Sequence, residues 1–201
     1  MQGLILIPDI TGFTKFVKNI DIDIGVRITR ELLLDLVERN PLNLEISEIE
    51  GDAILFYKQG KPLKMEALMN GFQHIMKCFN KKYQQLRDEY GIEAELSLKL
   101  IVHYGELSEY KIKGFTKLFG RAVIEAHRLL KNGSGNNSYM LVTDAYFKAL
   151  NQDVEDIVLP GWAHSQHERR DFEGVGALSF YYFHYLPQLP FMGEELKDKV
   201  A

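Results

Sequence analysis

Two acidic side chains, Asp9 and Asp52, stand at positions where a carboxylate needs a partner. Asp9 follows the apolar run at residues 3–7 and comes just before the segment Thr-Gly-Phe-Thr at residues 11–14. A carboxylate at the mouth of a buried strand is poorly solvated, so it pairs with a backbone N–H, a lysine or a metal ion. The residues alone leave these three partners open.

Asp52 lies in a tight turn, residues 50–52, between two segments that predict the strands of a hairpin. If the hairpin is next to the first strand, the two acids converge, and close carboxylates repel each other unless a cation or a proton intervenes. Mg²⁺ favours one or two carboxylates plus substrate phosphates, and N–H groups at a helix start after Asp9 suit a phosphate. The spacing also fits a structural alternative, in which Asp9 is a helix N-cap and Asp52 an ordinary turn residue.

The elements that must position these acids follow from hydrophobic periodicity and from turn residues. Strands are predicted at 3–7, 42–50, 52–58, 96–103, 106–114, 139–143 and 177–186. Helices are predicted at 24–38, 62–90 and 120–132, with short ones capped by Thr11 or Thr14 and starting from Asp144. The strand at 106–114 is expected to return antiparallel after Gly105, and residues 132–137 and 161–171 are expected to be polar connections.

These elements predict one α/β (α+β) domain over residues 1–201, with a mostly antiparallel sheet flanked by helices. Because the order begins β-α-β, the ferredoxin-like arrangement is the nearest common plan. In that plan the first and third strands are neighbours, which brings Asp9 and Asp52 together.

Composition bounds the function classes. The chain has 201 residues, 46% hydrophobic and 26% charged, as in a globular protein, and its net charge of −4 gives no basic field for nucleic acid. A single cysteine, Cys78, excludes an intramolecular disulfide framework and favours a reducing, cytoplasmic location. We expect Cys78 to be a buried, inert thiol.

No apolar run is long enough for a membrane span or a signal peptide, so no membrane partner is expected.

Four motifs, in the same order and with similar spacing, resemble the class III nucleotidyl cyclase domain of adenylate and guanylate cyclases. They are PDITGFTKF at 8–16, EIEGDAILFY at 48–57, LKLIVHYGEL at 98–107 and LFGRAVIEAHRLL at 118–130. The resemblance covers roughly residues 2–186 and implies the class III nucleotidyl cyclase fold.

The resemblance also implies roles for individual residues. Asp9 and Asp52 would hold two Mg²⁺ or Mn²⁺ ions, helped by the carbonyl of Ile10, and Arg128 would be the catalytic, transition-state arginine. ATP or GTP would be bound through the backbone of Ile10, Thr11, Gly12, Phe13 and Thr14, with its purine read at Glu48 and Lys117. The reaction would be attack of the ribose 3′-hydroxyl on the α-phosphate with release of pyrophosphate.

The family's shared active site implies an antiparallel homodimer. One protomer would give the metal-binding acids and its partner the arginine helix, so that Arg128 would not reach Asp9 of its own chain.

Several positions depart from the pattern of the resembled family. Its transition-state asparagine falls on Ile124, which forms no side-chain hydrogen bond, and a second phosphate-binding lysine falls on Glu173. Glu48 and Lys117 carry opposite charges and could neutralise each other in a salt bridge that closes the base pocket. We therefore expect the metal-binding groups to be intact, and the base-reading and transition-state groups to be partly lost.

Three functions remain. The first is a divergent cyclase-like domain that binds divalent metal and nucleoside triphosphate with weak or absent activity. The second is an active cyclase with non-standard residues, preferring GTP because of Glu48. The third is a ferredoxin-like module without nucleotide chemistry, which would bind RNA on the aromatic strand SFYYFHY at 179–185. The acidic balance argues against the third, and the imidazole of His103 is expected to be structural.

Overall fold

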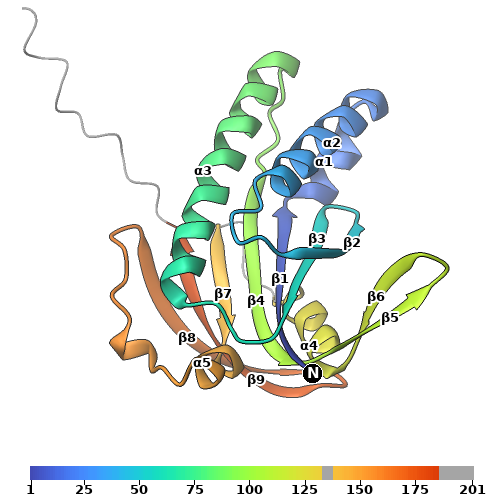
Figure 1. Cartoon of the computed structure of the whole chain (residues 1–201). Helices are drawn as coiled ribbons and strands as arrows, with labels where there is room; N and C mark the ends of the chain where they lie inside the picture. Colours follow the sequence, from blue (N-terminus) through green and yellow to red (C-terminus); the bar gives the residue numbers. More distant parts are fainter. Residues whose placement is uncertain (133–137, 186–201) are drawn as a thin grey trace, which may run out of the picture.

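The computed structural model describes residues 1–132 and 138–185 and places a mixed sheet between helices (Figure 1). The sheet strands are β1 (Gln2–Thr11), β2 (Glu45–Glu50), β3 (Ala53–Gln59), β4 (Ser97–Glu106), β7 (Tyr139–Thr143), β8 (Ala163–Phe172) and β9 (Gly176–Tyr185). They follow the order β2-β3-β1-β4-β7-β9-β8, and every neighbouring pair is antiparallel except β4 and β7. This mostly antiparallel α+β fold confirms the predicted class.

The remaining elements are helices on the two faces and one separate hairpin. The helices are α1 (Phe13–Asn19), α2 (Ile22–Glu38), α3 (Met65–Tyr90), α4 (Arg121–Leu129), α5 (Asp144–Leu150) and the single 3₁₀ turn η1 (Val154–Asp156). Strands β5 (Ser108–Ile112) and β6 (Phe115–Phe119) pair only with each other, and they project from the body as an arm (Figure 1).

The period of two along β1 assigns its side chains to two cores. Leu4, Leu6 and Ile10 pack with residues of α1, α2, α3 and α5, whereas Ile5 and Ile7 pack with residues of α4. Asp9 has the parity of Ile5 and Ile7, so its side chain lies on the α4 face of the sheet. The same alternation on β4 puts Lys99 on that face, beside Asp9 in the register of the two strands.

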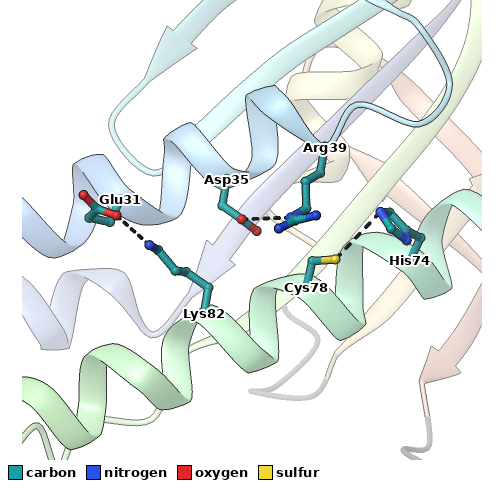
Figure 2. A network of polar contacts seen from close by, with 6 residues as sticks. All are labelled: Glu31, Asp35, Arg39, His74, Cys78 and Lys82. Carbon is teal, nitrogen blue, oxygen red and sulfur yellow. Dashed lines mark hydrogen bonds and ion pairs between the residues drawn. The ribbon is translucent and has the colours of Figure 1, made fainter.

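Helices α2 and α3 cover the other face side by side. Figure 2 shows the polar contacts along their seam: Lys82 Nζ lies 2.6 Å from Glu31 Oε2, and Arg39 Nε lies 2.9 Å from Asp35 Oδ1. Cys78 is half-buried rather than fully buried, with its Sγ 3.7 Å from Nε2 of His74 one turn earlier. None of the described helices has the length and apolar character that crossing a bilayer would require.

Two sequence predictions about connections are wrong. Residues 106–114 do not return along β4: the chain leaves the main sheet after Glu106 and forms the β5–β6 arm instead. Residues 161–171, expected as a polar loop, contribute to the edge strand β8, whose largely exposed residues gave no apolar alternation. The connection predicted at 132–137 lies, apart from Asn132, outside the described residues.

The aromatic strand β9 does not offer the exposed stacking surface that the RNA-binding hypothesis needs. Phe180, Tyr182 and Phe183 are buried in the two cores, and Tyr139 packs edge-on against Tyr182 with ring centroids 5.0 Å apart. These rings stabilise the sheet, because buried aromatic pairs prefer this geometry.

A buried polar network fastens α4 to the sheet. His103 on β4 is 1% exposed, and its ring nitrogens lie 2.9 Å from Thr143 Oγ1 and 2.9 Å from Glu125 Oε2. The other carboxylate oxygen of Glu125 accepts from Arg121 Nε at 2.6 Å. Hydrogen bonding from His103, followed by Arg121, lowers the pKa of the Glu125 carboxyl despite its burial. His103 is therefore structural, as expected.

This network generates a stability prediction. Glu125→Gln removes the charge that His103 and Arg121 stabilise, so we expect urea unfolding at pH 7 to show a loss of about 1–3 kcal/mol. Because the folded pKa of Glu125 is lowered, its contribution is complete above the ordinary value of 4.5 and is lost as the pH falls through the lowered value. The difference between the two proteins should therefore shrink below pH 4.5. A loss that is independent of pH, or one matched by Glu66→Gln on the exposed side of α3, would contradict this role.

Candidate functional site

A cavity of about 1010 Å³ opens on the α4 face, near the end of β1. This volume is at the upper limit of ordinary small-molecule sites, which measure about 300–1,000 Å³. Four segments form its wall: residues 9–15, the β2–β3 turn at 50–53, Lys99 of β4, and the α4 region at 123–131. The charged side chains that line it are Asp9, Glu50, Asp52, Lys15, Lys99, Arg128 and Lys131.

Asp9 has a lysine as its partner. Lys99 Nζ lies 3.2 Å from Asp9 Oδ1 and also donates to the carbonyl of Leu130, just after α4, at 3.0 Å. Burial raises the pKa of the Asp9 carboxyl, and Lys99 opposes that shift by attraction and hydrogen bonding. Asp9 is not a helix cap and does not end its strand, because β1 continues to Thr11. The Lys99 ion pair counts against Asp9 as a metal ligand, because a cation would have to compete with this lysine for the Asp9 carboxylate.

Asp52 is tied to β1 through its backbone. Its carbonyl accepts from Ile10 N at 3.2 Å, so the β2–β3 turn is held against the segment that follows Asp9. Burial, and then repulsion by Asp9, raise the pKa of the Asp52 carboxyl to about 6. Asp52 makes no ion pair within residues 1–132 and 138–185. The two acids therefore line one cavity. Attraction by Lys99 lowers the pKa of Asp52 less than burial and Asp9 raise it, and no ion pair compensates the Asp52 carboxylate in the described ranges.

The turn after β1 depends on a left-handed glycine. Gly12 has φ 90°, and a Cβ placed on it would be 2.6 Å from the carbonyl oxygen of Glu95, so a larger residue clashes. Gly12 is also the N-cap of α1, so neither Thr11 nor Thr14 caps that helix, contrary to expectation. Thr11 belongs to β1, and its buried Oγ1 has no hydrogen-bond partner. That oxygen is a free donor or acceptor in the wall of the cavity.

The α4 helix brings Arg128 to the same cavity as Asp9 and Asp52 of its own chain. Arg128 and Asp9 of one chain therefore line one cavity, and the expectation that Arg128 acts on the Asp9 of a partner protomer stays a prediction. The Arg128 guanidinium forms no ion pair or hydrogen bond in the described part of the chain. Its Nη2 is the nearest atom, at 3.9 Å, to a Cβ built on Gly174 in the β8–β9 turn. Ile124, at the position of the resembled asparagine, is 57% exposed in the cavity wall.

Glu48 and Lys117 form the salt bridge that their charges suggested. Lys117 Nζ lies 2.5 Å from Glu48 Oε2, and His127 Nε2 lies 3.6 Å from the other oxygen, Oε1. This bridge joins β6 of the arm to β2 of the main sheet. Neither Glu48 nor Lys117 lines the cavity, and neither does Glu173, which is exposed in the β8–β9 turn.

The residues present fit a hard cation in part. Asp9, Asp52 and the unpartnered Thr11 hydroxyl are oxygen donors of the kind that Mg²⁺ and Mn²⁺ use. Within the described ranges no three His, Cys, Asp or Glu side chains gather as a metal-binding group. A cation here would thus depend on two carboxylates and on oxygens of its ligand, as is usual for Mg²⁺ with phosphates.

Sequence reasoning missed the basic side chains of the cavity. Lys99 carried a signal: it belonged to the strand face shared with Ile101 and His103, and a lysine on a largely buried strand implies a charged partner. Lys15 and Lys131 form no ion pair among the described residues, and they had no signal because exposed lysines are common. His127 was missed because its contact with Glu48 joins elements far apart in the sequence.

Solved structures with this fold are nucleotidyl cyclases. The adenylyl cyclase CyaB from P. aeruginosa superposes with a TM-score of 0.71 at 15% identity, covering 90% of this chain and 93% of the other. The guanylate cyclase domain of RhGC from Catenaria anguillulae, in complex with GTP, gives 0.62 at 14% identity, covering 92% and 97%. At such identities the likeness shows the fold: this chain has the fold of adenylyl and guanylyl cyclase catalytic domains.

Sequence comparison gives relatives of another kind. A protein of Mycobacterium tuberculosis (strain ATCC 25618 / H37Rv), named Uncharacterized protein Rv2561/Rv2562, is 27% identical over 157 residues, which are 75% of this chain and 70% of the relative. Residues 29–139, more than half of the chain, match one family profile. The matched range includes the β2–β3 hairpin, α3, β4 and α4. The chain belongs to the family described as Protein of unknown function (DUF2652).

Proposed function

We propose that this chain is a single cyclase-homology domain, residues 1–201, that binds a nucleoside triphosphate together with Mg²⁺ or Mn²⁺. Turnover to a cyclic nucleotide is weak or absent. The observation that carries the proposal is one cavity lined by the converging acids Asp9 and Asp52 and by the unpaired cations Lys15, Arg128 and Lys131. Such a mixture suits a polyanion that arrives with its own cation.

The acids and the bases of the cavity have separate tasks in this proposal. Asp9 and Asp52 would hold the cation, with Lys99 keeping the buried Asp9 compensated when the site is empty. Arg128 and the two unpaired lysines would bind phosphate oxygens and orient the chain of phosphates. A bound divalent ion supplies neutralisation of phosphate charge and activation of a hydroxyl. In the homodimer that the resemblance implies, one protomer would give Asp9 and Asp52 and its partner would give the arginine helix.

The groups needed for fast turnover are missing from the wall. Ile124 forms no hydrogen bond to a ribose, and loss of one oriented polar group in a charge-stabilising site costs about 10²–10³ in rate. Glu173 places an acid where the resemblance implies a phosphate-binding lysine. Metal and phosphate binding stabilise ground state and transition state alike, so they survive such losses.

Binding is the direct test of the proposal. Calorimetric titration with Mn²⁺ and either ATP or GTP should show one site, and Asp52→Asn and Arg128→Ala should each weaken binding by about tenfold, the effect of losing one charged contact. Asp171→Asn and Arg169→Ala, exposed on β8 and away from the cavity, are the matched controls and should bind like the parent protein. The absence of nucleotide binding in the parent protein would refute the proposal.

Burial and the charge of Asp9 disfavour ionised Asp52. Removing the Asp52 charge should therefore stabilise the metal-free protein, although it weakens ligand binding. Asp52→Asn should stabilise the metal-free protein above pH 6, since the raised pKa means that ionised Asp52 disfavours the fold. The full shift corresponds to about 3 kcal/mol, and partial exposure reduces it to about 1 kcal/mol, or about 2–4 °C in Tm.

The gain should fade as the pH drops from about 6 through 3.8, below which Asp52 is protonated in both the folded and the unfolded state. Thermal melts at several pH values measure it. Excess Mn²⁺ should then stabilise the parent protein more than Asp52→Asn. Equal stabilisation of both by Mn²⁺ would mean that Asp52 is not a ligand.

Turnover should be absent or far below about 1 s⁻¹, the lower end of ordinary enzymatic rates. Restoring one group should recover little, because residues that act on one transition state are not additive. The triple variant Ile124→Asn, Glu173→Lys and Lys117→Asp should exceed the product of the single effects in an assay of cyclic AMP and cyclic GMP. Production by the parent protein at about 1 s⁻¹ or faster would establish the active-cyclase alternative instead.

A further inference from the structure

We propose that the cavity recognises the phosphate chain of its ligand and does not read the nucleobase. Metal-complexed inorganic tripolyphosphate would then bind as tightly as any nucleoside triphosphate. This inference rests on the proposed function. It narrows the ligand class to polyphosphates and sets no requirement on the group attached to the phosphate chain.

The first support is that the groups placed to read a base are engaged with each other. Lys117 Nζ lies 2.5 Å from one carboxylate oxygen of Glu48, and Nε2 of His127 lies 3.6 Å from the other, a distance too long for a hydrogen bond. The hydrogen bond to Glu48 raises the pKa of Lys117, which keeps the lysine charged and paired. We call these three residues the latch.

The second support is where the latch lies. It joins β6 of the arm, β2 of the sheet edge and α4, so opening it would separate three elements at once. Gln59 and Glu109 add another contact between sheet and arm, with Nε2 and Oε1 2.6 Å apart. His127 alone both belongs to the latch and lines the cavity, so the latch forms the border of the cavity rather than part of its floor.

The third support is the chemistry of what remains inside. The unpaired basic groups Lys15, Arg128 and Lys131 attract phosphate oxygens, and Asp9 and Asp52 attract the accompanying cation. Val123 and Ile124, which also line the cavity, have no polar side-chain atom. The mixture of basic and acidic groups in the wall matches a metal polyphosphate.

The expected affinities follow directly. ATP, GTP, UTP and tripolyphosphate, each with Mn²⁺, should have dissociation constants within about threefold of one another. AMP keeps a base and a ribose but has one phosphate, so it should bind at least about tenfold more weakly. A site built to hydrogen-bond a base would instead reject a ligand without it by about 10⁴–10⁵.

The experiment is a calorimetric comparison of these five ligands on the full chain with Mn²⁺. Tripolyphosphate that binds tenfold or more weakly than one nucleotide, or AMP that binds like ATP, would overturn the inference and leave the proposed function standing. If neither nucleotides nor tripolyphosphate bind, the proposed function fails, and the inference fails with it. The two failures are thereby distinguished.

A latch variant tests the cause. Lys117→Ala frees one oxygen of Glu48, which accepts hydrogen bonds from the donor edge of guanine, so GTP should gain about tenfold over tripolyphosphate. Lys111→Ala, which removes an exposed lysine from β5 of the same arm, is the control and should keep the parent pattern. If Lys117→Ala binds GTP and tripolyphosphate equally, the latch is not what prevents base reading, and this part of the inference is wrong.

Discussion

The site depends on one ion pair in the middle of the sheet, between Asp9 of β1 and Lys99 of β4. These residues are register partners, and both side chains lie on the face that α4 covers. Lys99 also donates to the Leu130 carbonyl, so one ammonium group fixes the carboxylate and the end of α4. A buried pair of this kind is costly to break, because removing either member leaves an uncompensated charge. The strand register and the end of α4 meet at this junction.

Around the junction the charges are not balanced within the chain. Asp52 is held beside Asp9 by its own backbone carbonyl and has no ion-pair partner in the described part of the chain, while Arg128 on the opposite wall is also unpaired. In a purely structural site such groups would be expected to neutralise each other, as Glu48 and Lys117 do nearby. Opposite charges kept apart across a cavity are pre-organised for a ligand that carries both signs, such as a metal complex of a polyanion.

Sequence patterns predicted the elements better than their connections. The alternating segment at 96–103, the apolar run at 52–58 and the helical stripe ending at Tyr90 specified β4, β3 and α3, because their apolar residues are the ones that become buried. The β5–β6 arm and β8 escaped because exposed strands carry no apolar alternation. Motif order brought out Asp9, Asp52 and Arg128, and their shared cavity follows from topology. The engagement of Asp9 by Lys99 could not be settled, since choosing between a lysine and a metal needs the register of two strands 90 residues apart.

The latch and the cavity lie in separate parts of the fold. Under the proposed function, base recognition could therefore be lost while phosphate and metal binding are kept. Asp9, Lys99 and Arg128 lie on β1, β4 and α4, and Asp52 lies in the β2–β3 turn, which a backbone hydrogen bond to Ile10 ties to β1. Glu48 and Lys117 lie on an edge strand and on an arm that only a few contacts attach to the body. Changes at the edge leave the core intact, so base recognition and transition-state groups can drift with little loss of stability. Under the proposed function, the phosphate and metal groups would be constrained by packing as well as by ligand, which would favour their retention in a protein with little turnover.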